Sequence, residues 1–175
     1  MSSSDRAPRR LAGLAAATAA LLLAACTVQP LYAPSPTGTA VTAKFSQIAI
    51  DPVDTRVAQV VRNKLIFDLD GGSEPTGAAY RMQLNVTSAE SALGVTAIET
   101  APSYSLTVSA TYQVTSLTTG QIVLRGTSRG TASYDRITQQ YANTRAEIDA
   151  ETRAATQAAD DIRIHLAAAA AQGVI

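Results

Sequence analysis

The chain has 175 residues, with 14 basic and 14 acidic side chains, one histidine, one cysteine and no tryptophan. The balanced charge leaves no basic surplus for non-specific binding to nucleic acid, so we expect no nucleic-acid partner. A single cysteine excludes a disulfide within the chain, and the length suits one domain with a hydrophobic core.

The sequence pattern of residues 1–25 predicts a lipoprotein signal peptide. Three arginines precede an uncharged apolar run over residues 11–23, and Leu23-Ala24-Ala25-Cys26 closes the segment. This order of positive, apolar and small residues is typical of a secretory signal, and the run is shorter than the roughly 20 residues that span a bilayer. We therefore expect cleavage before Cys26.

The sequence Leu-Ala-Ala-Cys resembles the lipobox of bacterial lipoproteins. The resemblance implies that the thiol of Cys26 carries a diacylglycerol and that its new amine carries a further acyl chain. Two or more chains hold a protein at a membrane stably, whereas one holds it only marginally. Thr27, rather than aspartate, follows the cysteine, and by resemblance to sorting rules this indicates the periplasmic side of the outer membrane.

The proline-rich segment over residues 26–43 is expected to be an extended tether, because proline fixes φ and removes an amide donor. A single domain is expected over residues 44–172. It opens with a short strand candidate at residues 45–50. Asp51 and Pro52 then resemble the N-cap and the first residue of an amphipathic helix that ends at Gly71.

Three alternating segments follow and predict an antiparallel meander with one solvated face. Even positions are apolar over residues 80–86 and again over residues 104–114, while the odd positions are polar. After a turn at residues 117–120, the third alternation runs to about Tyr134.

Residues 136–171 predict a helix, since alanine is the best helix former and this segment has no glycine or proline. One bent helix and two helices both fit the pattern. The apolar stripe consists of Ile137, Tyr141, Ile148, Ala155, Ala159, Ile162 and Leu166. The fold class is therefore α+β in the order β-α-β-β-β-α, with two helices packed on one face of a four-stranded sheet.

Nothing in the sequence forms a catalytic constellation, so we expect neither an enzyme nor a metal site, and no cofactor apart from the covalent lipid. The only histidine is His165 in the alanine-rich segment, and Cys26 would be lipidated, so neither a Ser-His-Asp nor a Cys-His site can be assembled. Acidic residues of the last helix alternate with arginines, which indicates solvated ion pairs four residues apart.

Several motifs together resemble the LptE family of lipopolysaccharide-assembly lipoproteins. In chain order they are Cys-x-x-x-Pro-Leu-Tyr at residues 26–32, Val60-Val61-Arg62-Asn63-Lys64-Leu65, a hairpin from Tyr104 to Thr118-Thr119-Gly120, Tyr134, Tyr141-Ala142 and Ile162-x-x-x-Leu166. The resemblance implies a subunit of the lipopolysaccharide transport machinery that helps the LptD β-barrel to fold and plugs its lumen.

The same resemblance implies contact with lipopolysaccharide, whose phosphates require cations, preferably arginine. The loop over residues 89–102 contains Glu90 and Glu99 but no basic residue, so the candidate contacts are Arg125, Arg129 and Arg136. Ordinary solvated charges are the alternative interpretation of these arginines. For the whole chain, the alternative function is that of an auxiliary lipoprotein of an ABC-type lipid transporter.

Overall fold

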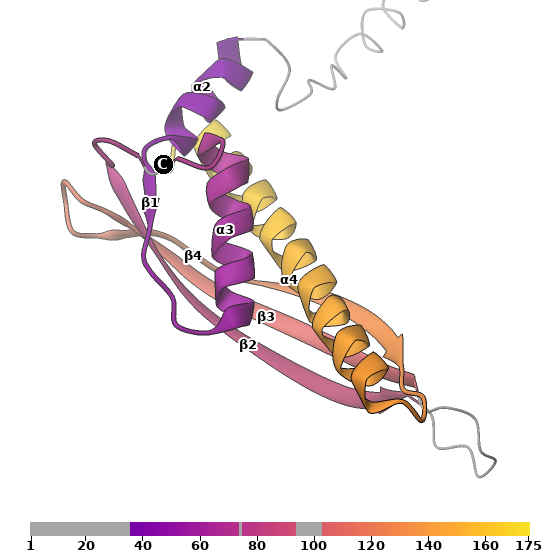
Figure 1. Ribbon diagram of the computed structural model, residues 1–175. Helices are drawn as coiled ribbons and strands as arrows, with labels where there is room; N and C mark the ends of the chain where they lie inside the picture. Colours follow the sequence, from indigo (N-terminus) through magenta and orange to yellow (C-terminus); the bar gives the residue numbers. More distant parts are fainter. Residues whose placement is uncertain (1–35, 74, 94–102) are drawn as a thin grey trace, which may run out of the picture.

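The computed structural model describes residues 36–73, 75–93 and 103–175, and it contains one sheet with helices on one side (Figure 1). The elements are α2 (Pro36–Phe45), β1 (Ile48–Ile50), α3 (Arg56–Asp70), β2 (Tyr80–Leu93), β3 (Ser103–Ser116), β4 (Ile122–Asp135) and α4 (Gln140–Ala171). The predicted α+β class and its β-α-β-β-β-α order are confirmed from β1 onward, and α2 is an additional helix before it. The signal peptide and Cys26 lie outside the described residues.

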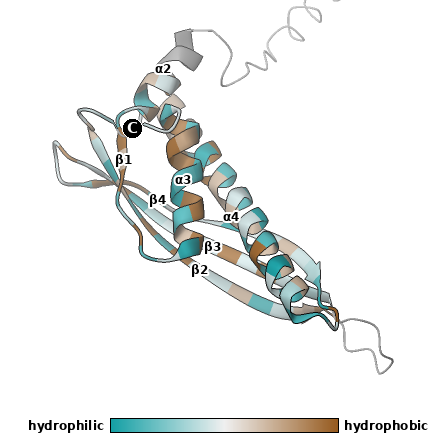
Figure 2. Ribbon diagram, in the orientation of Figure 1, coloured by the Kyte–Doolittle hydropathy of each residue, from teal (hydrophilic) through white to brown (hydrophobic). Residues whose placement is uncertain are grey.

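The four strands lie in the order β1-β2-β3-β4. β1 pairs with β2 in parallel, because α3 connects them, while β2, β3 and β4 form the predicted antiparallel meander. Even-numbered residues of these three long strands face the helices, as in the cross-strand row of Met82, Val114 and Leu124. The exception is Ile122, which a register shift places opposite Thr115. Hydrophobic and hydrophilic residues alternate along the strands (Figure 2).

The hydrophobic core lies between this side of the sheet and the two long helices. Its fully buried large side chains include Leu65 from α3, Met82 from β2 and Ile162 from α4. Much of the contact surface of α4 is alanine, including Ala150, Ala154 and Ala158. Small side chains let the helix backbone approach the strands closely, so the core is thin and sensitive to added volume.

The prediction of an extended tether is wrong for residues 36–43, which belong to helix α2. Val41 and Phe45 on this helix are buried in the core, and the Lys44 Nζ atom donates a 2.8 Å hydrogen bond to the carbonyl oxygen of Ala170 in the last turn of α4. Pro36 is compatible with the helix because the first helical residue needs no amide donor. Burial of two apolar side chains therefore outweighs the local bias towards extended chain.

Two boundaries near β1 also differ from the prediction. Phe45 ends α2, so the strand is limited to Ile48–Ile50. Helix α3 begins at Arg56 and not at Pro52, because the Asp51 amide donates to the carbonyl of Met82 and thus continues the pairing with β2. The N-cap is Thr55, whose hydroxyl accepts a 3.3 Å hydrogen bond from the amide of Ala58.

The last segment is one continuous helix of 32 residues, so the alternative of two helices is excluded. Its predicted stripe is buried from Ala155 onward. The prediction is wrong for Ile137, Tyr141 and Ile148, which are 51%, 78% and 36% exposed. The reason is that α3 begins beside Glu151, with which Arg56 forms an ion pair, and does not extend along the first turns of α4 (Figure 1).

Candidate functional site: the outward face of the sheet

The side of the sheet that points away from the helices carries a broad polar surface. Side chains alternate along a strand, so the odd-numbered residues of the three long strands share this side. We define the outward face as the following polar residues: Arg81, Gln83, Asn85 and Thr87 on β2; Ser103, Ser105, Thr107, Ser109, Thr111, Gln113 and Thr115 on β3; and Arg125, Thr127, Arg129, Thr131, Ser133 and Asp135 on β4. Towards the end of β2, the apolar Ala89 and Leu93 lie on the same side of the sheet.

Hydrogen bonds between strands order the side chains of the outward face. Gln113 donates to Gln83 at 2.6 Å, and the hydroxyls of Thr111 and Thr127 lie 3.1 Å apart. Near the other end of the sheet, the Ser103 hydroxyl donates to Asp135 at 2.5 Å. A hydroxyl or amide can make further hydrogen bonds, so these groups still have donors and acceptors for water or a polar partner.

A shallow depression of about 630 Å³ crosses the outward face. Asp51 and Pro52 lie at one side of it and Arg125 at the other, with strand residues between them. The strand residues are Gln83, Leu84, Asn85, Thr111, Tyr112, Gln113, Gly126 and Thr127. The depression therefore combines amide and hydroxyl groups with one cation and one carboxylate, a composition that suits a hydroxylated, anionic ligand.

Two of the three predicted lipopolysaccharide contacts lie on this face. Arg125 is the cross-strand neighbour of Gln113, and Arg129 is the neighbour of Ser109 four residues along β4. Both side chains are exposed, and within the described ranges neither has an ion-pair partner. The structure thus brings two available guanidinium groups to one strand.

Arg81 adds a cation that the sequence analysis did not single out. It faces outward from β2, and its guanidinium lies 3.5 Å from the carboxylate of Asp51. The alternating pattern already indicated that Arg81 is on the polar side of β2, because it lies between the apolar residues Tyr80 and Met82. Only the register of three strands places it on the same face as Arg125.

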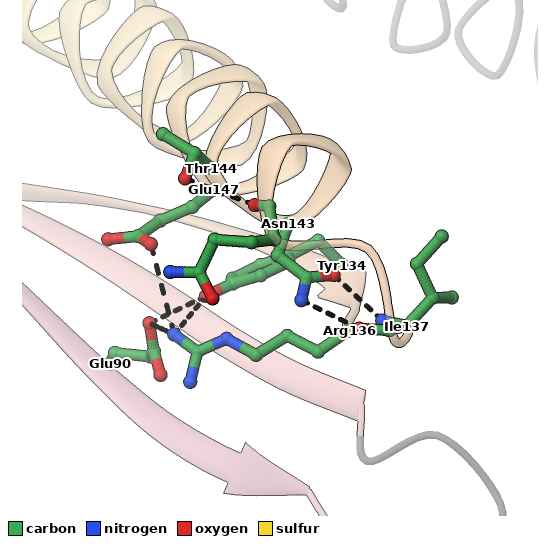
Figure 3. A network of polar contacts seen from close by, with 8 residues as sticks. Glu90, Tyr134, Arg136, Ile137, Asn143, Thr144 and Glu147 are labelled. Carbon is green, nitrogen blue, oxygen red and sulfur yellow. Dashed lines mark hydrogen bonds and ion pairs between the residues drawn. The ribbon is translucent and has the colours of Figure 1, made fainter.

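Arg136, the third predicted contact, lies on the helix side of the sheet in a network of polar contacts (Figure 3). Its Nη2 atom is 2.8 Å from both the Glu90 carboxylate and the Tyr134 hydroxyl. The guanidinium also lies over the ring of Tyr104, at 4.0 Å from the centroid. The structure therefore does not bring Arg136 together with Arg125 and Arg129, and its guanidinium is already bonded within the domain.

The phenol of Tyr134 is the most strongly perturbed group of this network. Its hydroxyl donates a 2.6 Å hydrogen bond to Glu90, and its ring stacks on Tyr104 with centroids 5.7 Å apart. Burial and the hydrogen bond to Glu90 raise the pKa of Tyr134 to about 12, although the nearby guanidinium of Arg136 opposes the rise. The neutral phenol thus ties β2, β3 and β4 together at this end of the sheet.

His165 pairs with a buried phenol and is itself partly exposed. Its Nδ1 atom is 3.0 Å from the hydroxyl of Tyr112, and its Nε2 atom is 4.0 Å from Asp161. Burial, with a smaller effect of Asp161, raises the pKa of Tyr112. Although Tyr112 borders the depression, its buried side chain points to α4, so the contact with His165 belongs to the packing of the helix on the sheet.

The acidic residues of α4 form ion pairs, as the sequence indicated. Arg153 binds Asp149 four residues earlier at 2.8 Å, and Asp160 lies 3.2 Å from Lys64 on α3. In the part of the chain that the structure describes, no three acidic, histidine or cysteine residues are grouped as metal ligands. The same part holds no helix with the length and hydropathy needed to cross a membrane.

Comparison with known proteins gives one family and several similar folds. A family model described as LptE, lipopolysaccharide-assembly, matches residues 45–166. No curated protein matches the sequence.

Among solved structures, a lipoprotein from Caulobacter crescentus CB15 superposes with a TM-score of 0.64 at 24% identity, over 76% of this chain and 97% of that one. A minor lipoprotein from Acinetobacter baumannii superposes with a TM-score of 0.53 at 16% identity, over 71% of this chain and 92% of that one. Both likenesses establish a shared fold.

Proposed function

The chain belongs to the LptE family of lipopolysaccharide-assembly proteins, and from this premise we propose a specific role for it. We infer that it is an outer-membrane lipoprotein subunit of the lipopolysaccharide transport machinery. In this role it is a non-catalytic folding partner and plug of an LptD-type β-barrel. The observation that carries the proposal is the outward face, where three long strands present polar side chains, with Ala89 and Leu93 of β2 as apolar neighbours.

A polar face of this kind is suited to the inside of a barrel. The lumen of a transmembrane barrel is polar and hydrated, whereas the surface that faces lipid is apolar. Hydroxyl and amide groups such as those of Thr111, Gln113 and Thr127 can exchange hydrogen bonds with water and with lumen side chains at little desolvation cost. A plug that touches the lumen through this face therefore needs no large apolar contact.

The lipid on Cys26 is the proposed anchor of the subunit. Residues 27–35 join it to α2, so the domain is held near the periplasmic side of the outer membrane. Anchoring confines the plug and the barrel to the same membrane, which raises their effective concentration. Cleavage before Cys26, acylation of its thiol and amine, and sorting to the outer membrane are parts of this proposal.

The proposed lipopolysaccharide contacts are Arg125 and Arg129. A guanidinium group binds a phosphate through two parallel hydrogen bonds, and both side chains are exposed on the outward face. The amides and hydroxyls of the adjacent depression suit the sugar hydroxyls of the same ligand. Arg136 stays a weaker candidate, because a ligand would have to replace its bonds to Glu90 and Tyr134.

Affinity purification of the full-length lipoprotein from detergent-solubilised outer membranes tests the proposal. We expect an LptD-type barrel to co-purify in a one-to-one complex, and we expect Cys26→Ser to lower its yield because the anchor is lost. Recovery of an inner-membrane ATPase or a substrate-binding subunit in place of the barrel would assign the protein to a lipid transporter instead. Mass spectrometry of the intact protein reports directly whether Cys26 is acylated.

A further inference from the structure

The helical layer of this domain covers only part of the sheet. Helix α3 has 15 residues and α4 has 32, so their lengths are about 22 Å and about 48 Å. Strand β2, with 14 residues, extends for about 46 Å beneath them. Since α3 begins at the level of Glu151, it covers neither the first turns of α4 nor the far half of β2 (Figure 1).

The side of α4 that contacts α3 continues into the uncovered turns. Tyr141 and Ile148 lie fourteen and seven residues before Ala155, and a spacing of seven residues returns to nearly the same side of a helix. Ala155 is fully buried, whereas Tyr141 is 78% and Ile148 36% exposed. The apolar stripe that holds α3 therefore extends two turns beyond the residues that α3 covers.

The neighbouring part of β2 is also uncovered. After Val86 every residue of the strand is exposed, although Ser88, Glu90 and Ala92 face the helix side. Arg136 lies 2.8 Å from Glu90 and 3.8 Å from Glu147, which places this part of β2 beside the first turns of α4 (Figure 3). We call Tyr141, Ile148, Ser88 and Ala92 the open surface; Glu90 borders it, but its carboxylate is already bonded to Tyr134 and Arg136.

We propose that the open surface receives a peptide segment of the barrel protein, with an apolar side towards α4 and an acidic residue near Arg145. This inference rests on the proposed function, because it names the surface by which the plug holds its partner. Arg145 lies between Tyr141 and Ile148, and among the described residues it has no ion-pair partner, whereas Asp149 and Glu151 are both paired. An acidic side chain would complement this cation.

Other occupants fit the open surface less well. An acyl chain would bury the hydroxyl of Ser88 against hydrocarbon, which costs free energy, whereas a peptide can present a polar group to it. A second copy of this chain is also a poor occupant, because Tyr141 and Ile148 together would bury far less than the ~800 Å² per partner of a stable dimer. A segment of a partner that is already bound needs only a small contact, since its effective concentration is high.

The chain's own N-terminal segment cannot reach the open surface. Lys44 places α2 beside Ala170, which is 29 residues from Tyr141 along α4, or about 44 Å. Residues 27–35 extend for at most about 31 Å. Residues 27–35 are therefore too short to bring the chain's own N-terminal segment to the open surface.

Photocrosslinking in the purified barrel complex tests the inference. With p-benzoylphenylalanine at position 141, we expect one crosslinked barrel peptide that contains apolar and acidic residues. The same label at the exposed Phe67 of α3 is the matched control, and it should not yield this peptide. A crosslink to lipopolysaccharide, to a second copy or within the chain would overturn the inference, as would no crosslink while the barrel co-purifies. Loss of the barrel itself overturns the proposed function instead.

A second measurement does not depend on the label. We expect Tyr141→Ser combined with Ile148→Ser to increase the dissociation rate of the barrel about tenfold, as for anchors of a small contact. Ile164→Ser is the matched control, because Ile164 is 56% exposed on another side of the same helix. Unchanged dissociation in the double variant, with unchanged resistance to urea, contradicts the inference.

Discussion

Gly130 of β4 lies directly against Ala154 of α4. A Cβ atom added to Gly130 would collide with the carbonyl oxygen of Ala154 and with the backbone nitrogen of Ala158. The helix thus rests on the strand backbone, and no side chain separates them. This contact explains why α4 presents alanines to the sheet and how a 32-residue helix packs on a thin core.

The first prediction concerns this contact. Gly130→Ala should lower the free energy of unfolding by roughly 1–3 kcal/mol, because the added methyl group forces the helix away from the strand. Alanine usually stabilises a strand relative to glycine, so a loss of stability identifies the collision. Urea unfolding measures the change. Thr131→Ala, at the next and exposed position, is the control and should change stability by less than about 0.5 kcal/mol.

The second prediction separates a packed helix from a tether at residues 36–45. Phe45→Ala should destabilise the domain by about 3–5 kcal/mol, since Phe45 is only 3% exposed. Ala43→Ser, at an exposed position of the same helix, should have little effect. If urea unfolding shows no difference between the two variants, α2 does not contribute to the core.

The third prediction is a dependence of stability on alkaline pH. The tyrosine of the unfolded chain loses its proton near pH 10, whereas folded Tyr134 keeps its proton until about pH 12. The native state therefore binds more protons in this window, and the contribution of Tyr134 to stability falls as the pH rises from 10 towards 12. Tyr134→Phe should remove this contribution.

Carbon-13 NMR of tyrosine labelled at Cζ measures the pKa of Tyr134 directly. Glu90→Gln should bring this pKa closer to the ordinary value, because the carboxylate that accepts the phenol proton is lost. A resonance that titrates at the same pH in both proteins would contradict the assigned role of Glu90.

The fourth prediction concerns lipopolysaccharide binding. Arg125→Glu combined with Arg129→Glu should weaken binding of purified lipopolysaccharide at least about tenfold, since a charge-assisted hydrogen bond contributes ~1.5–3 kcal/mol. Arg145→Glu combined with Arg153→Glu, two exposed charge reversals on α4, is the control with the same change in net charge. Equal binding by all three proteins in surface plasmon resonance would remove the outward face as the lipid contact.

The three long strands were predictable because the alternation of apolar and polar residues is a local feature of the sequence. Alternation over residues 80–86, 104–114 and 124–134 sets which side chains face the core, and the observed register preserves it. The alternation fails at Ile122, which a register shift places opposite Thr115 and which is 42% exposed. The position of the first helix residue was not predictable from Asp51 and Pro52, because the Asp51 amide is used by the sheet. Likewise, burial of Val41 depends on α4, which lies more than a hundred residues later in the chain.

In the candidate site, too, some features were predictable from the local sequence and others depend on contacts between distant residues. Arg125 and Arg129 share a strand face, as their spacing of four residues requires. Arg136 follows the strand immediately, but its contacts with Glu90, Tyr104 and Tyr134 place it on the other side of the sheet. Tyr141 and Ile148 have the spacing of core residues, and their exposure depends only on where α3 begins. Local periodicity therefore predicts which residues share a face, and long-range packing determines whether that face is buried or exposed.

The continuous helix α4 also sets the distance between the two ends of the domain. The chain enters the domain at α2, and Lys44 ties that helix to the last turn of α4, so the N-terminal side of the domain lies at one end of this helix. Tyr141 lies about 44 Å away at the other end. For the proposed anchor at Cys26, the number of turns in α4 would determine how far from the membrane surface the opposite end of the domain can reach. Each heptad removed would shorten that reach by about 10 Å.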